Sequence, residues 1–270
     1  MEGAAIYQIT TRKGFRASAS RAYFHPIKNR SNIDLSLRSQ VTRVLFEGKK
    51  ANGVEFVKNG KLEQVKAHCE VIICGGAINS PQVLQNSGIG SSALLSKFDI
   101  PVIHHSPNVG ENLQDHMGAS IYYQSKVPTL NQSLGSLWGK LNVGIDYILR
   151  RKGPLSLSVN QGGGFVKAQN NSEFPDTQIY FSPVSYTRAP TGTRPLMSPD
   201  PFPGFLLGYN PCKPTSRGFV RIKSKNPLAS NTVLDNVCNV VPDFVPNILS
   251  SPFNSVSNKS IETPLYFPDM

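Results

Sequence analysis

A short apolar run that leads into two glycines constrains the fold of this chain more than any other feature. Residues 71–74, Val-Ile-Ile-Cys, carry no polar residue, which predicts a strand covered on both faces inside a parallel sheet, with Cys74 as a small buried hydrophobe. Gly75 and Gly76 follow, and without a Cβ their main chain can lie against a flat or phosphorylated ligand. Ser80 and Pro81 then suit a helix N-cap and a first helical residue.

The composition is that of a globular protein of mixed α/β type. The chain has 270 residues, of which 39% are hydrophobic, with 22 glycines and 21 prolines. No run approaches the roughly 18 apolar residues that span a bilayer, and residues 1–16 lack the apolar core of a signal peptide. The sequence therefore predicts no membrane span and leaves the location of the protein open.

The net charge of +11 suggests a nucleic-acid partner until its distribution is considered. Residues 1–70 hold 13 Lys and Arg against 6 Asp and Glu, and residues 71–150 hold 4 against 4. In the N-terminal part the basic residues alternate with apolar ones, as on the solvent faces of strands. We therefore expect a solvated basic face and no nucleic-acid partner, although a basic nucleic-acid-binding module remains an alternative.

No metal site is predicted from the cysteines and histidines. None of the four cysteines has the CxxC spacing of a zinc site. His68 and Cys69 are neighbours in an expected strand, so their side chains should point to opposite faces. The pair His104 and His105 follows an extended segment, and the same reasoning applies there.

The N-terminal half reads as strands, a hairpin and short helices. Residues 34–47 alternate well enough for two short strands or one bent strand. Asn59-Gly60 separates two alternating runs and suits a tight hairpin turn. A further short helix is expected at residues 93–98, and a domain change near residues 117–120.

The C-terminal half reads as one helix and several antiparallel strands. Apolar residues at 137, 138, 141, 145 and 148 predict a helix over residues 136–150 with one buried stripe. Three glycines at 162–164 should break the pattern. Strands are expected at 177–181, 205–209 and 219–223, and the part from residue 236 on, rich in Pro, Ser and Asn, as an irregular tail.

Two segments carry a family resemblance. Residues 76–90, Gly-Ala-Ile-Asn-Ser-Pro-Gln-Val-Leu-Gln-Asn-Ser-Gly-Ile-Gly, closely resemble the second signature of the glucose-methanol-choline (GMC) oxidoreductases. Residues 108–116, Asn-Val-Gly-Glu-Asn-Leu-Gln-Asp-His, resemble that family's other internal landmark. With residues 16–24 and 34–46 upstream, the resemblance covers about residues 10–235. The insect glucose dehydrogenases look most similar.

The resemblance implies an α/β fold in two parts and an FAD cofactor. Residues 1–118 would form part of a three-layer FAD-binding domain, residues 119–235 part of an antiparallel-sheet substrate domain, and residues 236–270 the tail. The backbone of Gly75, Gly76 and Ala77 would line the FAD site near the adenosine and pyrophosphate, and the backbone of Val41 would pair with the adenine edge. From the residues alone, close strand–helix packing explains the glycines equally well, and Val41 is an ordinary strand valine.

The chemistry that the resemblance implies is oxidation of a CH–OH group in a small alcohol or sugar, with oxygen or a quinone-like compound as electron acceptor. In the family the base is a C-terminal histidine, and here no histidine follows His116, so no catalytic residue is assigned. No GxGxxG loop precedes Gly14. We therefore expect the middle part of such an enzyme. The alternatives are a non-catalytic paralogue or fragment, and a lyase on the same fold.

The family suggests a secreted protein, for which the Asn-x-Ser sequences at Asn29, Asn131, Asn170 and Asn258 are weak support.

A rival nucleotide motif overlaps the end of the signature segment 76–90. Residues 88–93 fit GxGxxA, and Glu111 lies at a distance that suits a ribose ligand. Such a motif must follow a strand, whereas residues 81–86 are expected to be helical. Helix C-cap and tight turn are therefore the preferred roles for Gly88 and Gly90.

Overall fold

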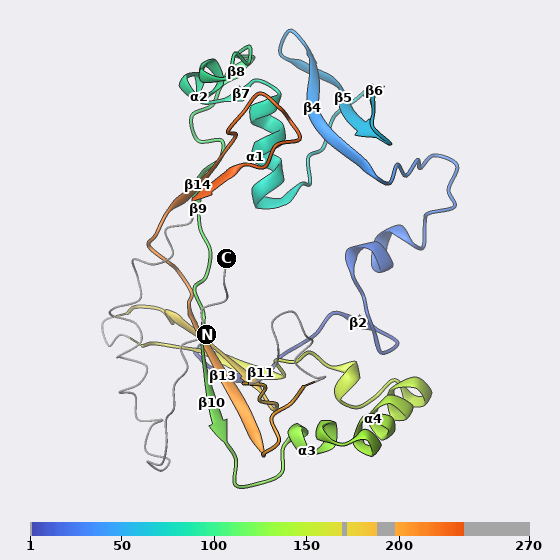
Figure 1. Ribbon diagram of the computed structural model, residues 1–270, viewed down its shortest axis with the longest axis vertical. Helices are drawn as coiled ribbons and strands as arrows, with labels where there is room; N and C mark the ends of the chain where they lie inside the picture. Colours follow the sequence, from blue (N-terminus) through green and yellow to red (C-terminus); the bar gives the residue numbers. More distant parts are fainter. Residues whose placement is uncertain (1, 169–171, 188–197, 235–270) are drawn as a thin grey trace. The chain divides into compact units, whose positions relative to one another are not determined.

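The computed structural model describes residues 2–168, 172–187 and 198–234, which form two compact units (Figure 1). The sheet unit comprises the described residues of 1–30 and 116–213, and the hairpin unit those of 31–115 and from 214 on. Both units are discontinuous in sequence, whereas the expected domains, 1–118 and 119–235, are contiguous. The change of unit at residue 116 lies next to the change expected near 117–120.

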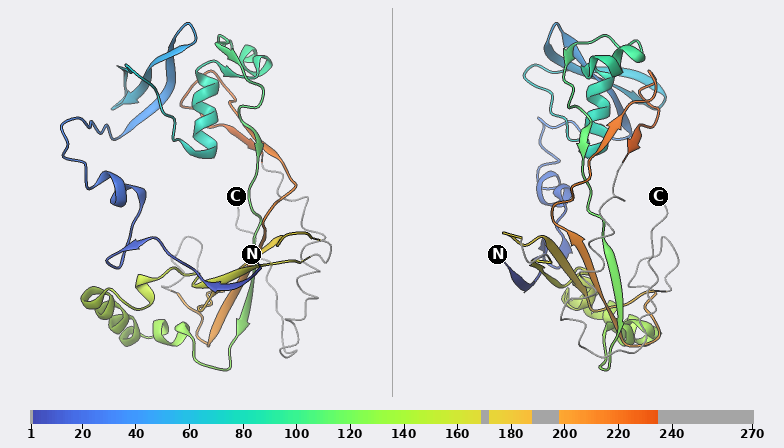
Figure 2. Two further views of the ribbon diagram at one scale, coloured as in Figure 1. Left: turned by 180° about the vertical axis from the view of Figure 1, so that it is seen from behind. Right: turned by 90° about the vertical axis from the view of Figure 1, so that its left-hand side faces the viewer.

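The hairpin unit begins with three antiparallel strands, β4 (Ser39–Glu47), β5 (Lys50–Lys58) and β6 (Lys61–Lys66), in that order. Asn59 and Gly60 join β5 to β6 with φ angles of 51° and 77°, which confirms the expected hairpin turn. The remaining elements are α1 (Gly76–Asn86), β7 (Ile89–Gly90), α2 (Ser92–Lys97), β8 (His104–His105), β9 (Glu111–Leu113), β14 (Gly218–Arg221) and β15 (Thr232–Leu234). Helix α1 contacts both β4 and β14, which Figure 2 shows from behind and from the side.

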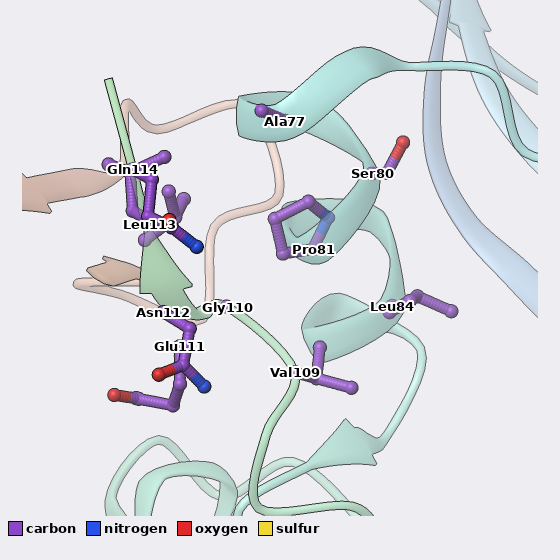
Figure 3. Close-up of a pocket in the computed structure, with 11 residues that line it drawn as sticks. Ala77, Ser80, Pro81, Leu84, Val109, Gly110, Glu111, Asn112, Leu113 and Gln114 are labelled. Carbon is purple, nitrogen blue, oxygen red and sulfur yellow. The ribbon is translucent and has the colours of Figure 1, made fainter. Parts of the chain in front are cut away.

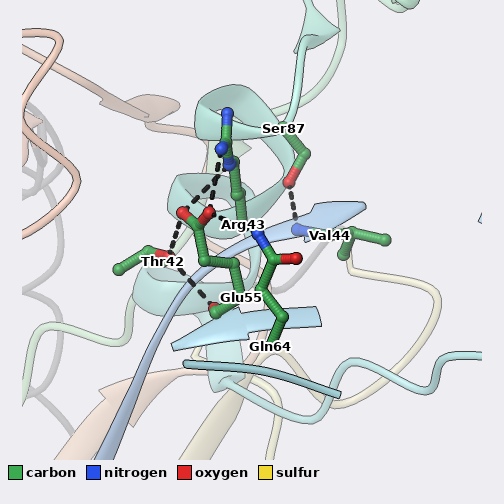
Figure 4. A network of polar contacts seen from close by, with 6 residues as sticks. All are labelled: Thr42, Arg43, Val44, Glu55, Gln64 and Ser87. Carbon is green, nitrogen blue, oxygen red and sulfur yellow. Dashed lines mark hydrogen bonds and ion pairs between the residues drawn. The ribbon is translucent and has the colours of Figure 1, made fainter. Parts of the chain in front are cut away.

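A buried carboxylate organises the sheet of the hairpin unit (Figure 4). Glu55 is only 5% exposed and receives hydrogen bonds from Arg43 Nε and Nη2 at 3.0 and 2.9 Å. Thr42 Oγ1 and Gln64 Nε2 also donate to it. These donors, the Arg43 guanidinium first, lower the pKa of Glu55 although burial opposes them. The ion pair with Arg43 on β4 and the hydrogen bond from Gln64 on β6 thus link Glu55 on β5 to both neighbouring strands.

The expected strand at residues 71–74 is wrong. This segment has no regular structure, Ile72 is 73% exposed and Cys74 is exposed. A strand needs neighbours for its backbone groups, and no described strand pairs with this run. His68 and Cys69 also lie in a bend after β6 and not in a strand.

Helix α1 begins earlier than the sequence suggested. It starts at Gly76 with Gly75 as N-cap, and Pro81 lies inside the helix. Gly76 has φ +77°, so the glycine pair itself makes the turn into the helix. Pro81 lacks the N–H that would bond to the carbonyl of Ala77, a loss close to the helix start. Helix α2 and the turn at Gly88 after α1 agree with the expectations.

The sheet unit is built on five antiparallel strands in the order β1-β11-β12-β13-β10. They are β1 (Gly3–Ile6), β11 (Gly162–Val166), β12 (Thr177–Ser182), β13 (Gly204–Pro211) and β10 (Ala119–Gln124). Strands β12 and β13 confirm two sequence predictions, and β14 in the hairpin unit confirms the third. The expected break at 162–164 is wrong, because these glycines form β11. A methyl group on Gly163 would overlap Ile179 O and the Tyr7 hydroxyl, so glycine is needed for this close pairing.

The other elements of the sheet unit are a small hairpin and helical segments. They are β2 (Thr11–Arg12), β3 (Phe15–Arg16), the π-helical turn η1 (Ser20–Phe24), α3 (Leu130–Gly135), α4 (Leu137–Arg150) and the 3-10 turn η2 (Pro154–Ser156). Helix α4 confirms the expected helix, but its apolar stripe is exposed and not buried. The half-buried face carries Gly139, Val143 and Tyr147 instead. A methyl on Gly139 would overlap Ser133 O, so α3 can approach only this glycine face.

In the described residues no helix has the length and apolar character needed to cross a bilayer. Asn131 is 1% exposed and its amide is hydrogen-bonded to Ser185, so this sequon is inaccessible in the folded chain. Asn170, Cys238, Asn258 and the expected tail at 236–270 lie outside the described residues.

Candidate functional site

A pocket of about 470 Å³ lies in the hairpin unit between α1 and the segment around β9 (Figure 3). Its size falls within the range of small-molecule sites, about 300–1,000 Å³. Three kinds of group line it: α1 side chains, the segment 109–114, and one residue of β14. The lining residues are Ala77, Ser80, Pro81, Leu84, Val109, Gly110, Glu111, Asn112, Leu113, Gln114 and Val220.

Gln85 fixes the two walls of this pocket relative to each other. Its side chain is fully buried, and Nε2 donates to the carbonyl oxygens of Val109 at 3.1 Å and Val220 at 3.0 Å. Its Oε1 accepts from the Ile222 N–H at 2.9 Å. One helical side chain thus satisfies three backbone groups from segments that are far apart in sequence. Sequence reasoning missed Gln85.

Gly110 allows the segment 109–114 to approach β14. It has φ +84°, and its carbonyl accepts a hydrogen bond from Val220 N at 2.6 Å. A methyl on Gly110 would overlap Val220 O and would lie 2.6 Å from Gln85 Nε2. Only glycine fits here, both for the backbone angle and for the space.

Glu111, the charged residue of the pocket lining, forms an ion pair with Arg221, which is not part of the lining. Glu111 Oε1 lies 2.8 Å from the Arg221 guanidinium, which also stacks on the Phe219 ring at 3.9 Å from its centroid. Both charged side chains are partly exposed, so the pair contributes little to stability. Within the pocket lining, the Glu111 carboxylate is thus already paired with a cation. Gly88 in the rival motif follows α1 as a helix-ending turn, in agreement with the preferred interpretation.

The start of α1 lies at this pocket and has no side-chain cap. Gly75, the N-cap, makes no side-chain hydrogen bond, and the first turn carries no acidic residue. The first N–H groups of a helix lack intrahelical partners and carry partial positive charge. Ala77 lines the pocket, and Gly75 and Gly76 directly precede it. The arrangement can therefore receive an anionic group from a pocket ligand.

The structure does not gather all the predicted site residues. Val41 lies in β4, where it pairs with Phe56 of β5, and it does not line the pocket. Of the landmark 108–116, residues 109–114 line the pocket, whereas His116 belongs to the sheet unit. There its Nδ1 lies 3.0 Å from Asn210 Nδ2. Across the described residues no group of three His, Cys, Asp or Glu side chains could hold a metal ion.

Sequence comparison finds relatives for most of the chain. The family model described as GMC oxidoreductase matches residues 1–118. The oxygen-dependent choline dehydrogenase of Staphylococcus saprophyticus is 38% identical over 255 residues, which are 93% of this chain and 41% of that protein. The enzyme of the same name from Chromohalobacter salexigens is 34% identical over 229 residues, covering 85% of this chain and 40% of that protein. The chain thus spans about two fifths of the length of these curated relatives.

Solved structures agree in fold. A formate oxidase from Aspergillus oryzae matches with a TM-score of 0.73 at 22% identity, over 86% of this chain and 44% of that one. A fungal aryl-alcohol oxidase matches with a TM-score of 0.73 at 21% identity, over 93% of this chain and 51% of that one. At such identities the likeness shows the fold alone. It confirms a mixed α/β chain with antiparallel sheets.

Proposed function

We propose, because this chain belongs to the GMC oxidoreductase family, that it forms part of an FAD-dependent oxidoreductase that oxidises a CH–OH group of a small-molecule donor. The family match supports the reaction class. The curated relatives are named for choline, and two solved structures for formate and aryl alcohols. The finer assignment to the insect glucose dehydrogenases, with a sugar as donor, remains a prediction.

One observation supports an FAD site in this chain. The uncapped start of α1 reaches the pocket at Ala77, directly after Gly75 and Gly76, and a Cβ on Gly76 would meet nothing within 4 Å. A pyrophosphate fits such a helix start, because free N–H groups and the helix dipole favour negative charge. The residues present therefore fit the phosphate part of FAD. We assign Gly75, Gly76 and Ala77 to it.

Val41 remains part of this proposal as an adenine contact. In the described residues β4 has a strand neighbour on one side only, so backbone groups on its other edge can pair with a ligand. Ser87 Oγ already accepts a hydrogen bond from the Val44 N–H on this strand, at 2.8 Å. A backbone group on the outer edge of β4 thus already forms a hydrogen bond outside the sheet.

When bound, FAD supplies the hydride acceptor of the reaction. The chain's own part is to bind and to exclude water: the α1 backbone holds the phosphates, while Pro81 and Leu84 give the pocket an apolar wall. We assign no catalytic residue. Oxygen or a quinone-like compound is proposed as electron acceptor, and an extracellular location is proposed from the family.

FAD binding to the purified chain tests this assignment. We expect flavin fluorescence polarisation to rise on binding, and Ala77→Trp, which puts an indole into the pocket, to weaken the affinity at least tenfold. Leu62→Trp is the matched control, because Leu62 is 61% exposed on β6 and does not line the pocket. No FAD binding, or equal effects of the two substitutions, would contradict the proposed site.

A further inference from the structure

Strand β9 contains a β-bulge at Asn112, within the lining of the pocket. Two residue steps on β9, from Glu111 to Leu113, match a single step on β14. Asn112 is the extra residue, and its φ of +60° lies in the left-handed region. Such bulges re-aim a side chain and are frequent next to binding sites. Asparagine tolerates this angle, but glycine would serve the backbone equally well, so what asparagine adds here is its carboxamide.

Two carboxamides of this wall take no part in holding the fold together. Asn112 and Gln114 both line the pocket (Figure 3), and neither side chain is hydrogen-bonded to another residue that the structure describes. By contrast, the carboxamide of Gln85 is fully paired, and Glu111 is paired with Arg221. Each primary amide offers one acceptor oxygen and two donor N–H groups. The segment 109–114 therefore presents neutral hydrogen-bonding groups to the pocket.

The rest of the lining limits what can bind beside these amides. Pro81 and Leu84 of α1 and Val109 of the facing segment are apolar and suit a flat ring (Figure 3). The uncapped start of α1 suits an anionic group, as described above. A ligand that satisfies all three features is a ring with a neutral polar edge that is joined to a phosphate group.

We propose that Asn112 and Gln114 form a carboxamide subsite, which recognises a ring edge that carries a hydrogen-bond donor next to an acceptor. The inference rests on the proposed function, because FAD carries such an edge at both of its ends. In adenine an amino group lies beside a ring nitrogen, a pattern that asparagine and glutamine bind through two hydrogen bonds. In the isoalloxazine ring an N–H lies between two carbonyl oxygens, and a carboxamide complements that edge in the same way.

Titrations of the purified full chain with four compounds test the subsite and identify the ring. The compounds are FAD, ADP, riboflavin and inorganic pyrophosphate, and isothermal titration calorimetry measures each affinity. In Asn112→Gly we expect the affinity for FAD to fall about tenfold, in line with the value of a two-bond amide contact. A matching fall for ADP assigns the subsite to adenine, and one for riboflavin assigns it to the isoalloxazine ring. Gln114→Met, which keeps the side-chain length, should weaken the same compound.

Asn59→Gly is the matched control for Asn112→Gly. Asn59 belongs to the same unit and has φ +51°, but it lies in the turn between β5 and β6 and does not line the pocket. Glycine fits both backbone angles, so both variants should resist urea as well as the parent chain does. The control should bind every compound as the parent does. Pyrophosphate has no ring, so its affinity should be the same for the parent and all variants.

Three results would overturn the subsite. The first is an Asn112→Gly variant that binds FAD, ADP and riboflavin as tightly as the parent, which would leave the proposed function intact. The second is an equal loss in Asn59→Gly. The third is a parallel loss of pyrophosphate binding, which would make Asn112 a purely structural residue. If ADP or riboflavin bound through Asn112 while FAD did not bind, the proposed function would be contradicted and the subsite supported. If none of the compounds bound, both would be contradicted.

Discussion

Substituting alanine for two glycines of similar backbone angle separates the cost of the angle from the cost of close packing. Gly110 has φ +84° and Gly76 has φ +77°. A methyl on Gly110 would overlap Val220 O and lie 2.6 Å from Gln85 Nε2, whereas one on Gly76 would meet nothing within 4 Å. Gly76→Ala is therefore the matched control for Gly110→Ala.

The expected free energies follow from these geometries. A left-handed backbone angle costs a residue with a Cβ about 1–2 kcal/mol, and alanine recovers about 0.4–1 kcal/mol by restricting the unfolded chain. Gly76→Ala should thus lower the free energy of unfolding by about 1 kcal/mol. Gly110→Ala adds an overlap with packed backbone, for which overpacked sites lose about 1–3 kcal/mol more. We expect a total loss of about 3 kcal/mol.

Urea unfolding of the full chain, followed by circular dichroism, measures both values. Equal m-values would show that the substitutions act on stability and not on the compactness of the unfolded state. If the two variants lost the same free energy within about 0.5 kcal/mol, the close approach of Gly110 to β14 would not contribute to the fold, and the reasoning from its contacts would be refuted.

Two further outcomes follow from the buried polar groups. Gln85→Leu should lower the free energy of unfolding by about 3 kcal/mol, because it leaves two carbonyl groups and the Ile222 N–H without partners. Hydrogen exchange of the Ile222 N–H should then become faster. Unchanged exchange would contradict the role of Gln85. The pKa of Glu55 is lowered from its ordinary value of 4.5, chiefly by the Arg43 hydrogen bonds, so its ionised form stabilises the folded chain above that pH. This stability should be lost as the pH falls through the lowered pKa, and the stability difference from Glu55→Gln should shrink there; a difference constant between pH 7 and pH 3 would exclude this role.

Several elements could be predicted from the sequence because their signals are local. Asn59-Gly60 tolerates the positive φ angles of a tight turn, and those are the angles observed. The helical spacing of apolar residues predicted α4, and the alternation of apolar and polar residues near 177 and 205 predicted β12 and β13. Each of these patterns depends only on residues a few positions apart. Gln85 had no such signal, since a helical glutamine is usually a surface residue.

The predictions that failed are those that depend on which segments, distant in sequence, lie next to one another in the fold. Residues 71–74 have the composition of a buried strand, but a strand forms only where another strand pairs with it, and none among the described residues does. The glycines at 162–164 looked like a break, yet they form β11 because two strands and Tyr7 approach them closely. The sequence predicted the existence of α4 and the wrong environment for its apolar face.

The sequence by itself determined the family, the hairpin, the helices and the glycine pair at the start of α1, because each depends on short-range chemistry. Only the tertiary structure decided which faces are covered. It placed segments 109–114 and 220–222 against α1 through Gln85 and so made a pocket. It also turned the apolar face of α4 to solvent. Burial depends on residues distant in sequence, and no local pattern specifies which segments meet.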